Sequence, residues 1–310
     1  MKLKLMLGTA QWGWTLDKQA AFALLDAWLK AGYSEIDAAT NYPINKQPSD
    51  FRASERILAE YISAHGLQGQ LSILMKVGSM DNMRTPAINL SPSFLRMMTD
   101  EYQRIFGENL GGIMIHWDNR EEPENAVETV AFLHELSMRG IRPGLSGIKY
   151  PEHYAAATAS HNFDLDIEVK HNVLVSDLAR YQGLLSGDTQ HRVWAYGISA
   201  GGVKLRGGYT PESTFSVRGG DSTFFDEQCA QLERMVSEWN LAFVRPPLLS
   251  MHHLGLLWAS SHPQIHGAVI GPKNTAQMAE TVDFLRNLDA FDYSDVVKGL
   301  SKWKGSKQEG

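Results

Sequence analysis

The segment Ser34–Tyr42 reads SEIDAATNY, and its pattern is the best guide to the fold of this 310-residue chain. Its apolar residues indicate a short buried strand, yet Asp37 lies within it and Tyr42 follows five residues later. A strand with a carboxylate near its C-terminal end, followed by a loop with a phenol, is how a barrel of alternating strands and helices presents reactive groups. Taken alone, the same pattern also fits a turn-capping Asp37 and a packed Tyr42.

Short apolar runs alternate with helix-like segments along the chain. Strands that alternate with helices predict a parallel sheet, and eight such units predict a closed (β/α)8 barrel, the TIM barrel, as one domain over residues 1–310. The predicted strands are Leu3–Leu7, Ser34–Asp37, Leu71–Val77, Gly112–His116, Ile141–Gly147, Leu165–Lys170, Arg192–Tyr196 and Gly267–Gly271. The first predicted helix begins after its N-cap Asp17, and the third and fifth begin at Pro92 and Pro151. The fourth contains Val130 in its apolar stripe. The others span Ser54–Ile62, Phe224–Trp239, Leu248–Ser260 and Asn274–Leu288.

An open doubly wound sheet is the alternative fold for this alternation. That fold would carry a G-x-G-x-x-G turn after the first strand, whereas residues 8–13 read GTAQWG, so the barrel is favoured. The longest irregular stretch, Gly197–Ser222, contains seven glycines and is typical of a functional loop. The polar tail Lys302–Gly310 is expected to fray.

Composition excludes several classes of function. The net charge of −6 argues against nucleic-acid and acidic-membrane partners, and the one cysteine excludes an internal disulfide or a multi-cysteine metal site. The adjacent His252 and His253 lack the spacing of a zinc motif, so no metal is expected. No apolar run approaches a membrane span or a secretory segment, which predicts a cytoplasmic protein; its assembly as a homo-oligomer is left open.

Polar groups stand at three successive strand ends. Asp37 ends the second strand, with Tyr42 in the loop beyond it, and Lys76 and His116 end the third and fourth strands. The ammonium of Lys76, held by Asp37, is expected to lower the phenol pKa and make Tyr42 a usable general acid. His116 would stabilise charge on a carbonyl oxygen, and a reduced nicotinamide would supply the hydride.

Eight motifs lie in order along nearly the whole chain: LGTAQWG, EIDAATNY, SERILAEYI, ILMKV, IMIHW, GLSG, VWAYGISAGG and VIGPKNTAQMAET. Together they resemble the aldo-keto reductase family. The resemblance implies a (β/α)8 barrel that reduces a small carbonyl substrate with NADPH. It also implies that Tyr42 is the acid, that Lys76 and Asp37 tune it, and that His116 orients the carbonyl.

The resemblance further implies a cofactor site along the later strand ends. Tyr196 matches the aromatic residue that stacks on the nicotinamide, and Lys273 matches the cation that pairs with the 2′-phosphate, which favours NADPH over NADH. The loop from Gly197 suits a pyrophosphate because glycine permits a close backbone approach. The other implied cofactor positions are Ser146, Glu168, Ser199, Gly271, Asn274, Gln277 and Glu280.

Some positions depart from the family pattern. Gly147 stands where the family usually has asparagine, Glu168 where it has glutamine, Gln277 where an arginine is common and Thr281 where asparagine is usual. Trp14 and Trp117, just past strand ends, either pack in the core or wall a substrate pocket.

Two other functions fit parts of the same pattern. A class I aldolase would use Lys76 as a Schiff-base lysine at a strand end. A regulatory member of the family would bind NADPH with little turnover; the complete set of Asp37, Tyr42, Lys76 and His116 argues against it.

Overall fold

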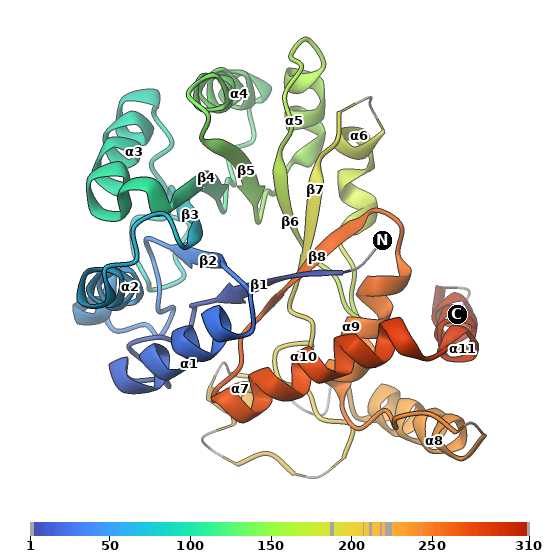
Figure 1. Ribbon diagram of the computed structural model, residues 1–310. Helices are drawn as coiled ribbons and strands as arrows, with labels where there is room; N and C mark the ends of the chain where they lie inside the picture. The colour runs from blue at the N-terminus through green and yellow to red at the C-terminus, as the bar shows by residue number, and fades with distance from the viewer. Residues whose placement is uncertain are drawn as a thin grey trace.

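Parallel strands close a barrel in the computed structural model, which describes residues 3–186, 189–206, 208–210, 213–217, 219–220, 225–242 and 244–308 (Figure 1). In these residues the strands pair in sequence order, and the last strand pairs with the first through Lys4–Gly267 and Leu7–Ile270. The strands are β1 (Lys4–Gly8), β2 (Glu35–Ala39), β3 (Ser72–Val77), β4 (Leu110–His116), β5 (Arg142–Ser146), β6 (Asp166–Lys170), β7 (Arg192–Tyr196) and β8 (Ile265–Ile270). The predicted (β/α)8 barrel is confirmed.

Helices surround the strands in Figure 1. They are α1 (Lys18–Lys30), α2 (Ala53–His65), α3 (Pro92–Phe106), α4 (Pro123–Met138), α5 (Pro151–Thr158), α6 (Gln182–Leu185), α7 (Thr214–Val217), α8 (Asp226–Ala242), α9 (Met251–Ser261), α10 (Thr275–Ala290) and α11 (Ser294–Gln308). Short 3-10 helices are η1 (Pro48–Asp50), η2 (Gly107–Asn109) and η3 (Leu178–Tyr181).

Local sequence signals set the starts of several helices. Asp17 caps α1, because its carboxylate accepts a hydrogen bond of 2.8 Å from the backbone N–H of Ala20. Proline occupies the first position of α3, α4 and α5, where the missing N–H is not needed. In α1 the apolar stripe that includes Leu24 and Trp28 is fully buried, as its helical spacing predicts.

The C-terminal region differs from the sequence-based expectation. Polar composition predicts a frayed tail from Lys302, but α11 continues to Gln308, and residues 309 and 310 lie outside the described residues. The indole N–H of Trp303 donates to the side chain of Gln231 in α8 at 2.9 Å, and the ammonium of Lys304 donates to the carbonyl of Val173 at 2.7 Å. These tertiary contacts explain the helix. The helix predicted over Phe224–Trp239 corresponds to α8, which begins at Asp226. Phe224 itself lies outside the described residues.

The barrel interior is packed in its middle by apolar side chains and carries ion pairs at the N-terminal ends of its strands. Met6, Leu74, Met114 and Trp194, each within its strand, form a small apolar cluster that is separate from the larger core between strands and helices. The indole N–H of Trp194 donates to Asp166 at 2.7 Å. Asp166 is also paired with Arg192 at 2.9 Å and lies 3.8 Å from Arg142. This packed end leaves the C-terminal strand ends as the place for a site.

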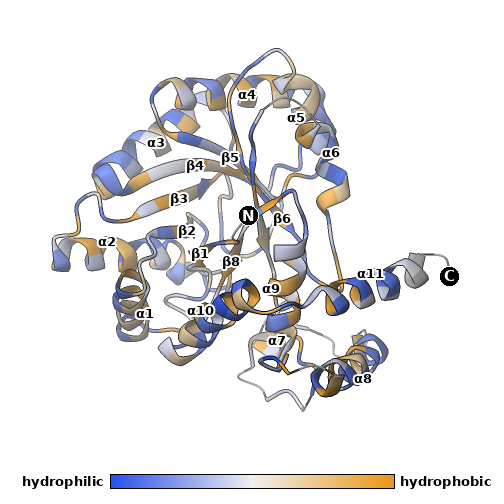
Figure 2. Ribbon diagram, turned by 45° about the vertical axis from the view of Figure 1, so that its right-hand side comes forward, coloured by the Kyte–Doolittle hydropathy of each residue, from blue (hydrophilic) through white to orange (hydrophobic). Residues whose placement is uncertain are grey.

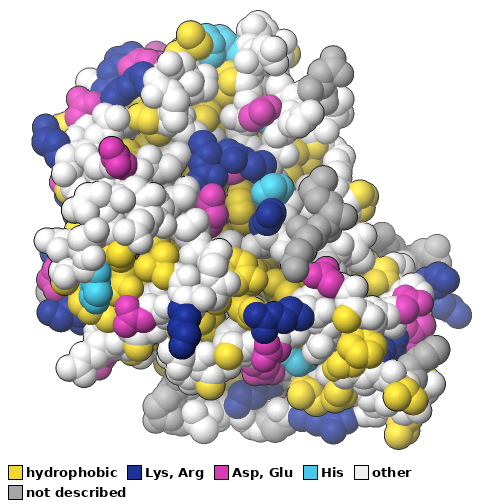
Figure 3. All heavy atoms as spheres, in the orientation of Figure 1, with side chains coloured by type: hydrophobic (Ala, Val, Ile, Leu, Met, Phe, Trp, Pro, Cys, Tyr) yellow, Lys and Arg dark blue, Asp and Glu magenta, His cyan; other side chains and the backbone are white. Residues whose placement is uncertain are grey.

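On the face shown in Figure 3, side chains of both charge signs are spread over the surface. Figure 2 shows α9 as one of the most hydrophobic helices, and seven of its residues are buried. Among the described residues, none of the helices combines the length and the apolar character needed to cross a membrane.

We predict that acid stability depends on His171, a buried residue directly after β6. Burial, with His262 and Lys304 nearby, lowers the pKa of His171 from 6.5 to about 4. The unfolded chain therefore binds more protons than the folded one between these values. The free energy of unfolding should fall as the pH drops from 6.5 towards 4, with a slope from this group of at most about 1.4 kcal/mol per pH unit.

Urea unfolding of His171→Asn at several pH values tests this expectation. The variant should show a shallower loss of stability between pH 6.5 and pH 4 than the wild type. His65→Gln, which changes an exposed histidine, is the control. An equally steep loss in His171→Asn would contradict the assignment.

Candidate active site

The four side chains predicted from the strand ends meet at one end of the barrel. Asp37, Tyr42, Lys76 and His116 are all buried. The ammonium of Lys76 donates a hydrogen bond to the Asp37 carboxylate and lies 5.2 Å from the centre of the Tyr42 ring. The Tyr42 and His116 rings have centres 6.1 Å apart and meet edge to face. The barrel thus brings together groups that are far apart in the sequence.

Glu168 in β6 adds a second carboxylate to this cluster. The Nζ atom of Lys76 lies 3.0 Å from Oε2 and 3.3 Å from Oε1 of Glu168. The hydroxyl of Ser146, at the end of β5, donates to Oε2 at 2.7 Å. Both Glu168 and Ser146 are buried. Sequence reasoning assigned Glu168 to the cofactor and missed this ion pair, although an acidic residue inside a buried strand needs a cation nearby.

The charges of the cluster perturb one another strongly. Burial alone would lower the pKa of Lys76, but the attraction of Asp37 and Glu168 raises it well above its usual value. Burial and repulsion from Glu168 raise the pKa of Asp37 well above its ordinary value, against the opposing effect of Lys76. Lys76 is therefore a firmly protonated ammonium between two carboxylates.

The phenol of Tyr42 behaves differently from the sequence-based expectation. Lys76 is expected to lower its pKa, and the ammonium does act in that direction. Burial, however, together with the negative charges of Asp37 and Glu168, outweighs the ammonium and raises the Tyr42 pKa above its usual value near 10. The expectation of a lowered pKa is therefore wrong, and the phenol is protonated at neutral pH.

His116 supplies a neutral imidazole. Burial lowers its pKa well below the usual value, and the positive charge of Lys76 acts in the same direction. Its Nδ1 atom is buried and has no hydrogen-bond partner among the described residues. A neutral imidazole carries one N–H donor and one acceptor nitrogen, so His116 can offer a hydrogen bond without adding charge.

The loop after β7 contains several residues with left-handed backbone. Tyr196 ends β7 half-buried, and the next residues include several with positive φ: Gly197 at 69°, Ala200 at 49°, Gly201 at 79° and Gly202 at 98°. A Cβ atom at Gly201 would meet no atom within 4 Å. Loops with such backbone can bind anions, but the N–H groups of Ala200 and Gly202 donate to the carbonyls of Gly197 and Ser199 within the loop. The proposed pyrophosphate contact therefore stays a prediction.

The segment after β8 holds the other proposed cofactor residues in a turn. Asn274 caps α10 by accepting from the N–H of Gln277 at 2.9 Å, and the Gln277 side chain accepts from the N–H of Lys273 at 2.9 Å. Glu280 lies 3.1 Å from His253. Gly271, the residue after β8, is exposed. The proposed adenosine contacts at Asn274, Gln277 and Glu280 stay predictions.

His252 connects these two segments. Its Nδ1 atom lies 3.0 Å from the Ser199 hydroxyl and its Nε2 atom 2.8 Å from the Thr281 hydroxyl. Because Thr281 donates its proton to the carbonyl of Gln277, His252 donates from Nε2 to Thr281 and accepts at Nδ1 from Ser199. Sequence reasoning missed this link, because the zinc-motif spacing reveals nothing of it. A histidine in the apolar helix α9 could have indicated such a link.

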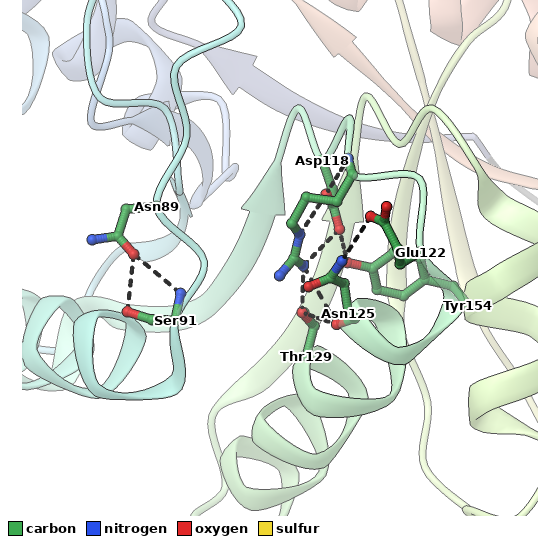
Figure 4. Close-up of polar contacts among 8 residues, drawn as sticks. Asn89, Ser91, Asp118, Glu122, Asn125, Thr129 and Tyr154 are labelled. Carbon is green, nitrogen blue, oxygen red and sulfur yellow. Dashed lines mark hydrogen bonds and ion pairs between the residues drawn. The ribbon is translucent and has the colours of Figure 1, made fainter.

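A polar network fixes the rim beside His116 (Figure 4). Asp118 accepts from the guanidinium of Arg120 at 2.8 and 2.9 Å and from the hydroxyl of Tyr154 at 2.6 Å. Arg120 also donates to Thr129 in α4 at 2.7 Å. The network ties the loop after β4 to α4 and α5. Among the described residues, no group of three His, Cys, Asp or Glu side chains is arranged to hold a metal ion.

Comparison with known proteins identifies the family. A model described as the aldo/keto reductase family matches residues 4–299, nearly the whole chain. The chain belongs to this family. Family members are oxidoreductases, so the protein is an oxidoreductase enzyme. A protein of Pseudescherichia vulneris, named "Uncharacterized 11.2 kDa protein in crtE 3'region", is 38% identical over 76 residues, which cover 24% of this chain and 74% of that protein.

In this aldo/keto reductase, Gly147 departs from the expected asparagine for a steric reason. Its φ angle is 68°, and a Cβ atom there would lie 2.4 Å from Cδ1 of Trp117. Trp117 itself has a φ of 61°, and its backbone N–H donates to the carbonyl of Ser146 at 2.9 Å. The indole lies beside His116, with ring centres 4.6 Å apart. The indole therefore takes the space in which an asparagine side chain would begin.

We expect Gly147→Ala to destabilise the reductase by about 2–4 kcal/mol, because the left-handed backbone and the overpacked indole both disfavour a Cβ atom. In a Trp117→Ala background only the backbone part, about 1–2 kcal/mol, should remain. Chemical denaturation of the four proteins gives this cycle. Equal losses in both backgrounds would show that Trp117 does not restrict Gly147.

Proposed function

We propose that this chain catalyses the NADPH-dependent reduction of an aldehyde or ketone to an alcohol. The observation that carries the proposal is a protonated phenol, Tyr42, beside the buried ammonium of Lys76 and edge to face with the neutral imidazole of His116. These are the groups needed to bind a carbonyl oxygen and to protonate it.

Each residue of the cluster has a distinct role in the proposed reaction. Tyr42 gives its hydroxyl proton to the carbonyl oxygen as that oxygen gains negative charge. His116 donates a hydrogen bond to the same oxygen and orients it. Lys76, held by Asp37, stabilises the tyrosinate that remains after proton transfer. The bound cofactor would supply the hydride to the carbonyl carbon.

The later strand ends suit the cofactor. Tyr196 would stack on the nicotinamide, while Ser146 and Glu168 would face its carboxamide. The positive-φ loop from Gly197 fits the pyrophosphate, and Lys273 would pair with the 2′-phosphate. The remaining proposed cofactor residues are Ser199, Gly271, Asn274, Gln277 and Glu280. We propose that the half-buried Trp14 and Trp117 wall the substrate pocket, and that the enzyme acts in the cytoplasm.

Tyr42→Phe should lower kcat by about 10²–10⁴-fold, since a general acid typically contributes that factor. The ring and its packing are retained, so NADPH affinity, measured by fluorescence titration, should change little. NADPH oxidation with a panel of aldehydes and ketones measures turnover.

Tyr33→Phe is the matched control. Tyr33 lies just before the N-terminal end of β2 and stacks on Trp28, outside the site. It should keep the activity of the wild type. Near-wild-type kcat in Tyr42→Phe would show that another group is the acid.

Lys273→Met should raise KM for NADPH by about 10–100-fold, because a charge-assisted hydrogen bond contributes about 1.5–3 kcal/mol. KM for NADH, which has no 2′-phosphate, should change far less. Lys18→Met is the control, since Lys18 is an exposed lysine paired with Glu60. A parallel rise in both KM values would argue against a 2′-phosphate contact.

The aldolase alternative conflicts with the electrostatics of Lys76. A Schiff-base lysine must be available as a neutral amine, whereas Asp37 and Glu168 raise the pKa of Lys76 well above its usual value. Trapping with borohydride and substrate would reveal an aldolase. Binding of NADPH without turnover of any carbonyl would instead indicate a regulatory member of the family.

A further inference from the structure

Lys76 pairs with two carboxylates, although a simple ion pair needs only one. Asp37 holds it from the neighbouring strand β2, and Glu168 holds it from β6, which is separated from β3 by β4 and β5. The role proposed above for Lys76 requires only Asp37, and the carboxamide contact proposed for Glu168 requires an acceptor oxygen but no charge. Glu168 therefore adds a buried charge, at 2% exposure, that those roles do not explain.

We propose that Glu168 is a positioning residue that acts through Lys76: it holds the ammonium from across the barrel and adds a second negative charge beside it, and so sets the pH range in which Tyr42 acts as an acid. The inference rests on the proposed function, because it concerns the acid of that reaction.

The contacts of Glu168 hold its carboxylate group in place. Its Oε2 atom accepts from Ser146 at 2.7 Å and from Lys76 at 3.0 Å, while Oε1 lies 3.3 Å from the same ammonium. With three of these contacts in a buried site, Glu168 has little freedom to turn away from Lys76.

The charge balance around Tyr42 follows from the groups that face it. Asp37 in β2 and Glu168 in β6 are carboxylates, Lys76 in β3 is the ammonium, and His116 in β4 is neutral. In the alkaline range where a phenol titrates, two negative charges therefore oppose one positive charge. A tyrosinate next to this excess is disfavoured, in agreement with the raised Tyr42 pKa.

This balance has a consequence for each direction of the reaction. Carbonyl reduction needs the protonated phenol, so it should persist to a higher pH than Asp37 and Lys76 alone would allow. Alcohol oxidation needs the phenolate as a base, so it should require a correspondingly higher pH. Glu168 would thus set the pH range of the enzyme without touching the carbonyl.

Glu168→Gln tests the proposal, because glutamine keeps the shape of the side chain and its oxygen can still accept from Ser146. We expect the alkaline limb of kcat/KM for carbonyl reduction to move down by about 1–2 pH units, the range by which a nearby charge shifts a pKa. The rise of alcohol oxidation should move down by the same amount. Coincident profiles for the variant and the wild type would overturn the proposal.

A second measurement does not depend on activity. The protein without cofactor is labelled with 13Cζ-tyrosine, and the Tyr42 signal, one of ten, is assigned by its loss in Tyr42→Phe. Its titration midpoint should be about 1–2 units lower in Glu168→Gln than in the wild type. A midpoint that is not lower, or a signal that stays that of the phenol in both proteins up to the alkaline limit of folding, would overturn the proposal.

Three further variants complete the experiment. Glu168→Asp keeps the charge and should keep the wild-type profile. Glu55→Gln removes a buried carboxylate that hydrogen-bonds Tyr102 rather than Lys76, and should leave the profile unchanged. If Glu168→Gln does not fold, Asp37→Asn removes the other carboxylate and should also lower the Tyr42 midpoint. An Asp37→Asn midpoint equal to that of the wild type would overturn the charge account.

The design separates this inference from the proposed function. A wild-type protein that oxidises NADPH with no carbonyl compound refutes the proposed function. If the wild type oxidises NADPH with a carbonyl compound, but the pH profiles and the Tyr42 midpoint are the same in Glu168→Gln, only the role of Glu168 is refuted.

Discussion

A buried ammonium between two carboxylates is the interaction on which the site depends. An ammonium removed from water is unfavourable by several kcal/mol unless opposite charges and hydrogen bonds replace its hydration. Lys76 obtains these from Asp37 and Glu168, and Ser146 in turn orients Glu168. These residues come from β2, β3, β5 and β6, and the closed barrel brings them together. The state of the Tyr42 phenol then follows from the charges of this cluster.

The two ends of the barrel use buried charge for different purposes. At the N-terminal ends of the strands, Asp166 is bonded to Trp194 and Arg192, and its charge is balanced by arginines that reach the solvent. At that end, both oxygens of the Asp166 carboxylate have partners. At the C-terminal ends, the cluster around Lys76 retains a polar face, with the Tyr42 phenol and the His116 imidazole as groups that can act on a ligand. Chemistry is therefore confined to one end.

Loops of this reductase are held by short polar links rather than by regular structure. His252 joins the loop after β7 to α10 through Ser199 and Thr281, so the two segments proposed to bind the cofactor share one hydrogen-bonded connection. Asp118 fixes the loop after β4 in a similar way. Such links limit the motion of the rim, which suits a site in which a proton donor must stay aligned with a carbonyl oxygen.

The sequence by itself determined the barrel, the order of its strands and the gathering of Asp37, Tyr42 and Lys76, because these follow from apolar periodicity and from the convergence of parallel strand ends. Tertiary structure alone decided the rest. Glu168 meets Lys76 across 92 positions, and the resulting charge balance reverses the expected shift of the Tyr42 pKa. Local patterns contain no distances between strands that are not neighbours, and electrostatic effects depend on those distances and on burial.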